Sequence, residues 1–434
     1  MCKESDYSTI LVIKKRNAVD MALEWAYVLY VFWALYPYFT WETFYNGIFR
    51  NIGGVSFSSI FFLLILCFTI LKFGNGKLKI KRAEKKLFLG VILSAVVLLG
   101  VCGNKYFLLF SGSVVPYLVI ALFLILPDDM KVRIFQKYVT VVAITLVPSI
   151  FYYLLNIIGI DLSHNFIQSY ESIKVSAGAQ YKHYPFAVQL ISSYNPITQY
   201  RLCGIYDEAG KLGTIAALFL AAEGFQLKGK RVNWILLIAG CLTFSASFYV
   251  MAVLYFAMDN IMKHRTKNAL LLFSIVAIYL VFITIPISNP TVATLQSRIM
   301  LTSEGLAGDN RTNILYDQLF ADFQSSDITK LLFGYGDGAI GIIQNERGID
   351  GSSYKSLIYN YGYVGFGISI VWILYFAKEM LKRYRLEMAY IVAVTLLYLA
   401  NIYQRPSVFY PPYLLILLGG VYCWCGKNNY EVKK

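Results

Sequence analysis

The sequence predicts an all-α integral membrane protein with about 12 transmembrane helices and two long external loops. Of its 434 residues, 58% are hydrophobic and only 15% are charged, whereas soluble domains carry about 25% charged residues. Apolar blocks of about 20 residues, enough to cross ~30 Å of hydrocarbon, follow one another along the chain. Basic residues collect between these blocks, as in the cytoplasmic loops of membrane proteins.

Eleven apolar blocks are predicted to be membrane helices. The first is expected to remain as a helix and not to be cleaved as a signal peptide, because the preceding residues are polar and the block lacks a small-residue cleavage site. The blocks cover residues 21–39, 55–73, 87–102, 106–126, 138–158, 209–225, 232–258, 269–286, 356–377, 388–404 and 408–425.

The positions of Lys and Arg predict the orientation, since basic loops stay in the cytoplasm. Segment 72–86 holds seven basic residues against one acid, Glu84. Both termini and the remaining basic clusters are expected on the same side, so the net charge of +14 reflects topology and not a nucleic-acid surface. These clusters contain Lys14, Lys131, Arg133, Lys137, Lys230, Lys263 and Lys382.

Block 232–258 has basic clusters at both ends, which a single crossing cannot place on one side. We therefore predict a short helical hairpin that turns at Thr243-Phe-Ser-Ala-Ser247, where hydroxyl groups can satisfy the freed backbone. The alternative is one long tilted helix with a Ser-rich packing face. The hairpin raises the count of crossings to 12 and puts both long loops outside.

Two long external loops divide the membrane regions, and loops of this length usually carry function. In the larger loop, Asp309 is expected to cap an amphipathic helix over residues 310–324, with Ile314, Leu315, Leu319, Phe320 and Phe323 on one face. The divisions are 1–158 (helices 1–5), 159–208 (first loop), 209–286 (helices 6–9), 287–355 (large loop) and 356–434 (helices 10–12 and a cytoplasmic tail).

Several short motifs follow in a characteristic order. Arg201-Leu-Cys-Gly-Ile-Tyr-Asp-Glu-Ala-Gly-Lys-Leu-Gly213 enters a helix, and Leu242-Thr-Phe-Ser-Ala-Ser247 follows a basic turn. The order resembles the O-antigen polymerase and ligase superfamily over about residues 200–370. The large loop adds Ser297-Arg298, Arg311 at a helix start, Leu332-Phe-Gly-Tyr-Gly336 and Tyr359-Asn-Tyr-Gly-Tyr-Val-Gly365.

The chain departs from the family pattern at three points. Ala209 stands where the family has Pro, and no Arg follows Thr243-Phe-Ser245. Ligases of the superfamily carry a His near the end of the large loop, which here contains none. The resemblance therefore favours a polymerase over a ligase.

The resemblance implies an enzyme that joins undecaprenyl-pyrophosphate-linked oligosaccharides at the external face of the cytoplasmic membrane. It would use no metal or cofactor, and its product would be O-antigen, capsule or a related polysaccharide. A chain-length regulator is an expected partner, beside membrane lipid. Three alternatives stay open: an O-antigen ligase acting on lipid A core, a lipid-linked oligosaccharide flippase or other transporter, and a cell-wall elongation glycosyltransferase.

The leaving group of such a polymerase is a pyrophosphate, which Arg binds well because it offers two donors to phosphate oxygens. The expected pyrophosphate ligands are Arg201, Arg298 and Arg311, although each could instead form a salt bridge or snorkel to the membrane surface. Lys211 is either a further phosphate contact or an interfacial anchor. Arg347 is expected in solvent.

An acceptor hydroxyl needs a base or a hydrogen-bond acceptor. Glu208 and Asp207 are the candidates, with helix capping as the equal alternative for both. His164 and His183 are expected to be solvated, and no residue spacing predicts a metal site. The first loop also carries tyrosines that could stack on sugar rings or simply pack, namely Tyr181, Tyr184, Tyr194, Tyr200 and Tyr206.

Overall fold

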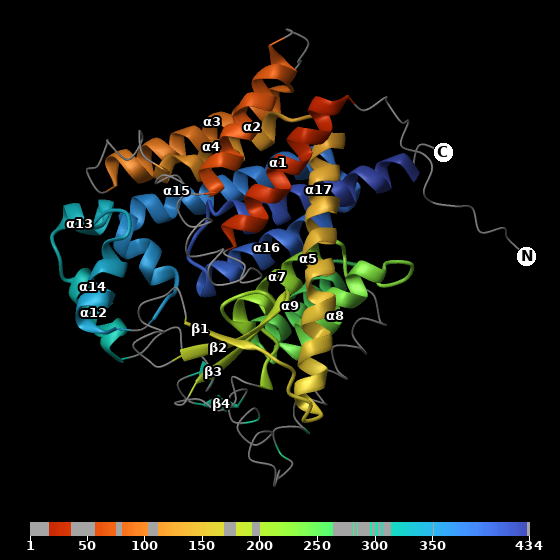
Figure 1. The fold of residues 1–434 in the computed structure, drawn as a ribbon. Coiled ribbons are helices and arrows are strands. Elements are labelled where there is room, and N and C mark those ends of the chain that lie inside the picture. The colour runs from red at the N-terminus through yellow and green to blue at the C-terminus, as the bar shows by residue number, and fades with distance from the viewer. Residues whose placement is uncertain are drawn as a thin grey trace, which may run out of the picture.

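The computed structural model describes most of the membrane regions and parts of both long loops (Figure 1). Isolated residues and two short strands, β4 (Leu301–Thr302) and β5 (Gly305–Leu306), are described between residues 281 and 306. Predicted block 269–286 therefore lies almost wholly outside the described residues. The continuous described ranges are 17–35, 57–74, 80–102, 112–168, 179–192, 200–263, 314–349 and 351–431.

The described chain is mainly helical, as the composition predicts. A π-helical turn, η2 (Val96–Val101), extends α3, and the short 3-10 turns η4 (Gly112–Val114) and η6 (Arg385–Glu387) precede α4 and α16. The α-helices are α1 (Ala18–Ala34), α2 (Phe57–Phe73), α3 (Arg82–Ala95), α4 (Val115–Ile125), α5 (Asp128–Ile157), α7 (Ala209–Ala222), α8 (Arg231–Leu242), α9 (Ala246–Lys263), α12 (Ile314–Gln324), α13 (Ile328–Phe333), α14 (Ala339–Arg347), α15 (Tyr354–Arg383), α16 (Met388–Gln404) and α17 (Pro411–Glu431).

Three helical stretches are long and apolar enough to cross a membrane: Asp128–Ile157, Tyr354–Arg383 and Arg385–Gln404. Several shorter helices are apolar as well. α5 leaves Ile144, Val147 and Phe151 more than half exposed along one side. An apolar surface of this kind would be costly in water, so the fold fits a membrane protein. The expected 12 crossings remain a prediction.

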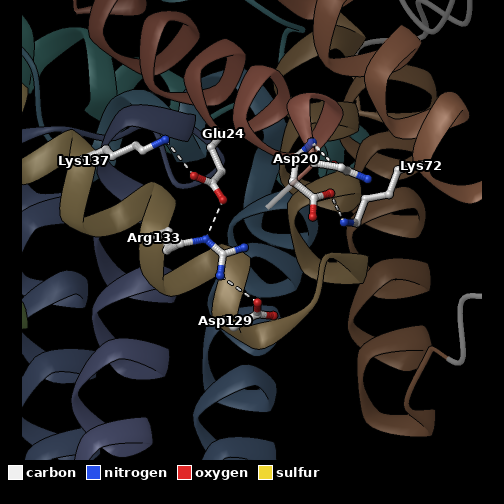
Figure 2. A network of polar contacts seen from close by, with 7 residues as sticks. Asp20, Glu24, Lys72, Asp129, Arg133 and Lys137 are labelled. Carbon is white, nitrogen blue, oxygen red and sulfur yellow. Dashed lines mark hydrogen bonds and ion pairs between the residues drawn. The ribbon is translucent and has the colours of Figure 1, made fainter. Parts of the chain in front are cut away.

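The sequence predicted a helix from residue 138, preceded by a cytoplasmic loop that contains Lys131, Arg133 and Lys137. In the structure these residues are already part of α5. The helix begins at Asp128, because Asp128 and Asp129 favour the positive end of its dipole. Arg133 and Lys137 both bind Glu24 of α1, at 2.5 and 2.7 Å, and Arg133 also binds Asp129 at 2.7 Å (Figure 2). Glu24 is fully buried, so these ion pairs join α1 firmly to α5.

A second set of ion pairs meets at the buried Lys131. Its ammonium lies 3.3 Å from Glu84 and 3.6 Å from Asp128, and 4.2 Å from the centre of the Tyr422 ring. Arg383, at the end of α15, binds Asp128 and lies 3.7 Å from Glu84. We call both sets together the charge network. It gathers the ends of α1, α3, α5, α15 and α17 at one end of the bundle.

α15 is interrupted near its start, at Gly362, where the backbone takes φ +65°. The break frees two carbonyl groups, and the loop after α13 satisfies both. Tyr335 N donates to Tyr359 O at 3.0 Å, and Gly336 N donates to Asn360 O at 2.8 Å. The two glycine motifs of the large loop are therefore in direct contact, and they join α13 and α14 to α15.

The first long loop contains a three-stranded antiparallel sheet in the order β1-β2-β3, which the all-α prediction did not include. The strands are β1 (Asn165–Gln168), β2 (Ala179–Tyr184) and β3 (Ala187–Ser192). Apolar and polar residues alternate over Ala179-Gln-Tyr-Lys182 of β2, which is the pattern of a half-buried strand, whereas β3 does not alternate. One face packs on Cys203 and Ala209 at the start of α7.

The amphipathic helix of the large loop is α12, but its buried face is rotated from the predicted one. Tyr316, Leu319 and Phe323 are buried, whereas Ile314 and Leu315 are 78% and 54% exposed. The buried set recurs every three to four residues, as on one side of a helix. In Figure 1, α12, α13 and α14 lie together at the left, against the start of α15.

We expect Glu24→Ala to destabilise the fold strongly. Loss of this carboxylate leaves Arg133 and Lys137 without their buried partner, which costs about 3–5 kcal/mol for such pairs. The measurement is the apparent melting temperature in detergent. Asp317→Ala is the control, because it removes a half-exposed ion pair with Lys355 that should contribute at most about 1 kcal/mol. Equal melting temperatures for the two variants would contradict this role of Glu24.

Gly362→Ala should separate α13 from α15. An added Cβ would lie 2.2 Å from the carbonyl oxygen of Leu332, in a conformation that only glycine adopts easily. Limited proteolysis of the segment 314–349 should become faster. Gly367→Ala is the matched control on the same helix, since nothing lies within 4 Å of its added Cβ. Equal protection in both variants would show that the contact is dispensable.

Candidate functional site

The start of α7 carries the predicted carboxylates. Asp207 binds Lys211 at 3.1 Å, one helical turn later, and both side chains are largely buried. Glu208 is the N-cap residue of α7, but its side chain makes no capping hydrogen bond. Capping therefore does not explain the side chain of Glu208, and the structure brings Asp207, Glu208 and Lys211 together at one helix start.

Arg405 completes this cluster, and the sequence interpretation missed it. It lies just after α16, and its guanidinium forms an ion pair with the carboxylate of Glu208. Both side chains are about one fifth to one quarter exposed, so solvent reaches the pair. The signal was present in the sequence: Arg405-Pro406 stands in a short turn assigned to the external face, where arginines are few. We call Asp207, Glu208, Lys211 and Arg405 the α7 cluster.

Arg201 lies at a neighbouring turn and has a structural contact there. Its Nε donates to the carbonyl oxygen of Thr243 at 2.9 Å, and Leu202 N donates to Leu242 O at 3.0 Å. These bonds satisfy the end of α8, where the chain turns into α9 through Thr243, Phe244 and Ser245. Arg201 is thus tied to the α8–α9 turn.

The α8–α9 turn is held by hydroxyl groups. Thr243 Oγ1 donates to Gly240 O at 2.6 Å and accepts from Ser245 N at 3.2 Å. Thr214 of α7 donates to Ser247 at 3.3 Å. An added Cβ on Gly213 would lie 2.7 Å from Ser245 Cβ, so the turn packs tightly on α7. This packing holds Arg201 beside the helix that carries Glu208.

Two buried polar atoms of this region have no hydrogen-bond partner in the part of the chain that the structure describes. They are the hydroxyl oxygen of Tyr206 and Nε of Arg405. Burial raises the pKa of Tyr206, so its hydroxyl remains a donor at neutral pH. Buried polar groups are normally paired. Tyr206 is fully buried, whereas Arg405 belongs to a partly exposed ion pair, so Arg405 is the better placed of the two to meet a polar ligand.

A polar cavity of about 190 Å³ lies against the face of the sheet turned away from α7. Asp161 and Lys182 line it and form an ion pair of 2.6 Å. The hydrogen bond from Lys182 lowers the pKa of Asp161, which stays an ionised acceptor. Gln189 and Tyr200 line it too. Tyr200 precedes Arg201 in the chain, and its ring is 38% exposed.

The other tyrosine and histidine candidates described in the first loop contribute to packing and hydrogen bonds within the fold. Tyr181, Tyr184 and Tyr206 are buried, so their rings are not open for stacking on sugars. Tyr181 instead donates to the carbonyl oxygen of Asp207 at 2.7 Å. His183 is only 5% exposed, so the expectation of a solvated side chain was wrong for it.

The remaining candidates are Arg298, Arg311 and Arg347. Arg298 and Arg311 lie outside the described residues, as do Tyr194 and His264, so their roles stay predictions. Arg347 is exposed in the last turn of α14. Across the described ranges, no group of three or more His, Cys, Asp or Glu residues is arranged to hold a metal ion.

Comparison with known proteins adds no assignment. No protein-family model, no curated protein and no solved structure matches the chain.

The ion pair between Glu208 and Arg405 should couple α7 to α16. In a double-mutant cycle, Glu208→Gln and Arg405→Gln should show a coupling energy of about 1 kcal/mol, since the pair is partly screened by solvent. Denaturant unfolding in detergent measures it. The control cycle uses Asp327 and Lys330, which are about half exposed and should couple more weakly than Glu208 and Arg405. Additive effects at Glu208 and Arg405 would show that the pair does not act as a unit.

Proposed function

We propose that the protein is a polymerase of undecaprenyl-pyrophosphate-linked oligosaccharides, acting at the external face of the cytoplasmic membrane. The observation that carries the proposal is the α7 cluster with its new member, Arg405, beside Arg201. Arg405, Lys211 and two carboxylates gather at the start of α7, and Arg201 is bound to the α8–α9 turn that packs on α7. Such a cluster suits a charged leaving group and an acceptor hydroxyl near a membrane surface.

The reaction requires one bond to form and one to break. The acceptor hydroxyl attacks the anomeric carbon of the growing glycan, and the bond from that carbon to the pyrophosphate oxygen breaks. The lipid pyrophosphate leaves with both electrons of this bond. Arg405 and Arg201 stabilise its negative charge, and Glu208 takes the proton of the acceptor hydroxyl.

The ion pair of Glu208 and Arg405 fits this division of roles. Without substrate, each ion neutralises the other. A pyrophosphate carries more negative charge than a carboxylate, so it competes for the guanidinium and releases Glu208 as a base. The Arg405 Nε group, which lacks a partner among the described residues, is a further donor for phosphate oxygen. Catalysis would thus begin only when the lipid-linked donor is bound.

The polar cavity at the sheet is the proposed place for a sugar ring. A carboxylate, two amides and a tyrosine line it, and these groups form hydrogen bonds with hydroxyls. Its 190 Å³ is smaller than the ~300–1,000 Å³ of pockets for drug-sized ligands. One sugar ring of the glycan, away from the reacting carbon, could occupy it, since Tyr200 in its lining precedes Arg201 in the chain.

The ligase and transporter alternatives differ in what they require. A ligase needs a lipid A core acceptor, and the family's His is absent from the large loop. A transporter needs polar groups along a path through the membrane. The charge network is closed by its own ion pairs, and it lies at the end of α5 remote from the α7 cluster.

Purified protein incubated with a lipid-pyrophosphate-linked repeat unit should produce a ladder of polysaccharide on a gel. Arg405→Ala should slow the ladder about 10²- to 10³-fold, the usual cost of losing one group that stabilises a developing negative charge. Arg405→Lys should recover part of the rate, because it keeps the charge but not the paired donors. Glu208→Gln should be slow at every pH.

Arg347→Ala is the matched control and should give the ladder of the unchanged protein, because Arg347 is exposed on α14. A full ladder with Arg405→Ala would remove Arg405 from the mechanism. Movement of the lipid-linked unit across a vesicle without chain growth would overturn the polymerase proposal. Transfer to lipid A core alone would favour the ligase.

A further inference from the structure

A groove of about 430 Å³ lies between α15 and α16. Leu374, Ala377 and Leu381 of α15 form one wall, and Val392 and Leu396 of α16 form the other. Both helices are long and apolar enough to span a membrane. The groove therefore opens on a surface that lipid chains would cover.

Three basic residues line the end of this groove: Lys378, Lys382 and Arg385. Lys378 and Lys382 are four residues apart on one side of α15, and Arg385 follows in the 3-10 turn η6. Arg383 differs from them, because it binds Asp128 in the charge network. The end of α15 thus carries one arginine that stabilises the fold and three cations whose side chains border the apolar groove.

The positive charge of the groove is only partly neutralised. Lys382 binds Glu379 at 2.8 Å, and Glu387 accepts a hydrogen bond from Trp424 Nε1 at 2.7 Å. Among the residues that the structure describes, no carboxylate forms an ion pair with Lys378 or Arg385, and both are exposed. The mouth of the groove therefore attracts an anion.

The length of the groove matches one leaflet of a bilayer. Leu374 and Lys382, which both line the groove, are eight residues apart on α15, which corresponds to about 12 Å along the helix. Half of a ~30 Å hydrocarbon core is about 15 Å. Thr395 also lines the groove, is 3% exposed, and its hydroxyl has no hydrogen-bond partner in the described part of the chain. It could donate to an ester carbonyl.

We propose that this groove binds an anionic phospholipid, with its phosphodiester on Lys378, Lys382 and Arg385 and one acyl chain between α15 and α16. Basic pockets between membrane helices are suited to such headgroups. α16 has 17 residues, so Arg385 and Arg405 are separated by about 25 Å along the helix. The groove and the α7 cluster therefore lie at opposite ends of α16. The positive-inside rule assigns the groove to the cytoplasmic leaflet, and the proposal does not depend on the polymerase function.

Native mass spectrometry of the purified full chain with equimolar phosphatidylglycerol and phosphatidylcholine tests the site. The unchanged protein should retain phosphatidylglycerol preferentially. Lys378→Gln, Lys382→Gln and Arg385→Gln should each weaken that binding roughly fivefold, the effect of about 1 kcal/mol per cation near a lipid headgroup. Val392→Trp should fill the groove and lower the binding of both lipids while all three cations remain.

The matched control replaces Arg82, Lys85 and Lys86 with Gln. The groove triple variant combines Lys378→Gln, Lys382→Gln and Arg385→Gln. Arg82, Lys85 and Lys86 are also exposed and belong to a cluster assigned to the same membrane face, and replacing them lowers the net charge by the same amount. The control should keep the preference for phosphatidylglycerol. Equal losses in both triple variants, or no loss in the groove variant, would overturn the site. Melting temperatures in lipid-free detergent establish that each variant is folded, and the three surface substitutions leave the core unchanged.

Discussion

The carboxylate of Glu24 is fully removed from solvent, and such a charge is tolerated only when cations neutralise it. α5 supplies two cations, Arg133 and Lys137, on the same side of its first turns. Lys131, on another side of the same helix, is held by Glu84 and Asp128. One helix start thus fixes α1, α3 and α15 through charges that cannot be separated cheaply in a low-dielectric environment. These ion pairs therefore fix the start of α5 against α1, α3 and α15.

The far end of α5 contacts the sheet, which in turn contacts the candidate site. Ser149 donates to the carbonyl oxygen of Phe186 at 2.7 Å, in the turn between β2 and β3. Tyr153 donates to Tyr200 O at 2.9 Å, and the sheet then reaches the start of α7 through Tyr181 and Asp207. Glu208 and Arg405 therefore meet because α5 places the sheet and the sheet places α7 (Figure 1).

Local patterns predicted the features that depend on local physics. The apolar blocks predicted the helices. The turn between α8 and α9 falls at Thr243 to Ser245, within the segment where a turn was predicted because basic clusters flank block 232–258 at both ends. The strands were missed because residues 159–208 were interpreted as a loop, and because β3 lacks the alternation of apolar and polar residues that would have indicated a strand. Asp207, Glu208 and Lys211 share one helix turn, so spacing alone predicted their proximity. Arg405 lies 197 residues from Glu208, and no local pattern reports a pairing of that range.

Both breaks in the helices lie at the end of the bundle that carries the α7 cluster. The α8–α9 turn is bound by Arg201, and the break at Gly362 lies near the start of α15, where the Tyr354 ring is 6.2 Å from that of Tyr403 beside Arg405. Irregular backbone is tolerated in membrane proteins only where protein or water satisfies it. Neighbouring segments of the same chain accept or donate some of the backbone hydrogen bonds at each break. The partly exposed Glu208 and Arg405 indicate that water reaches this end. In the proposed reaction, a polar glycan would therefore approach the cluster from this end, and the lipid tail would lie along the apolar sides of the same helices.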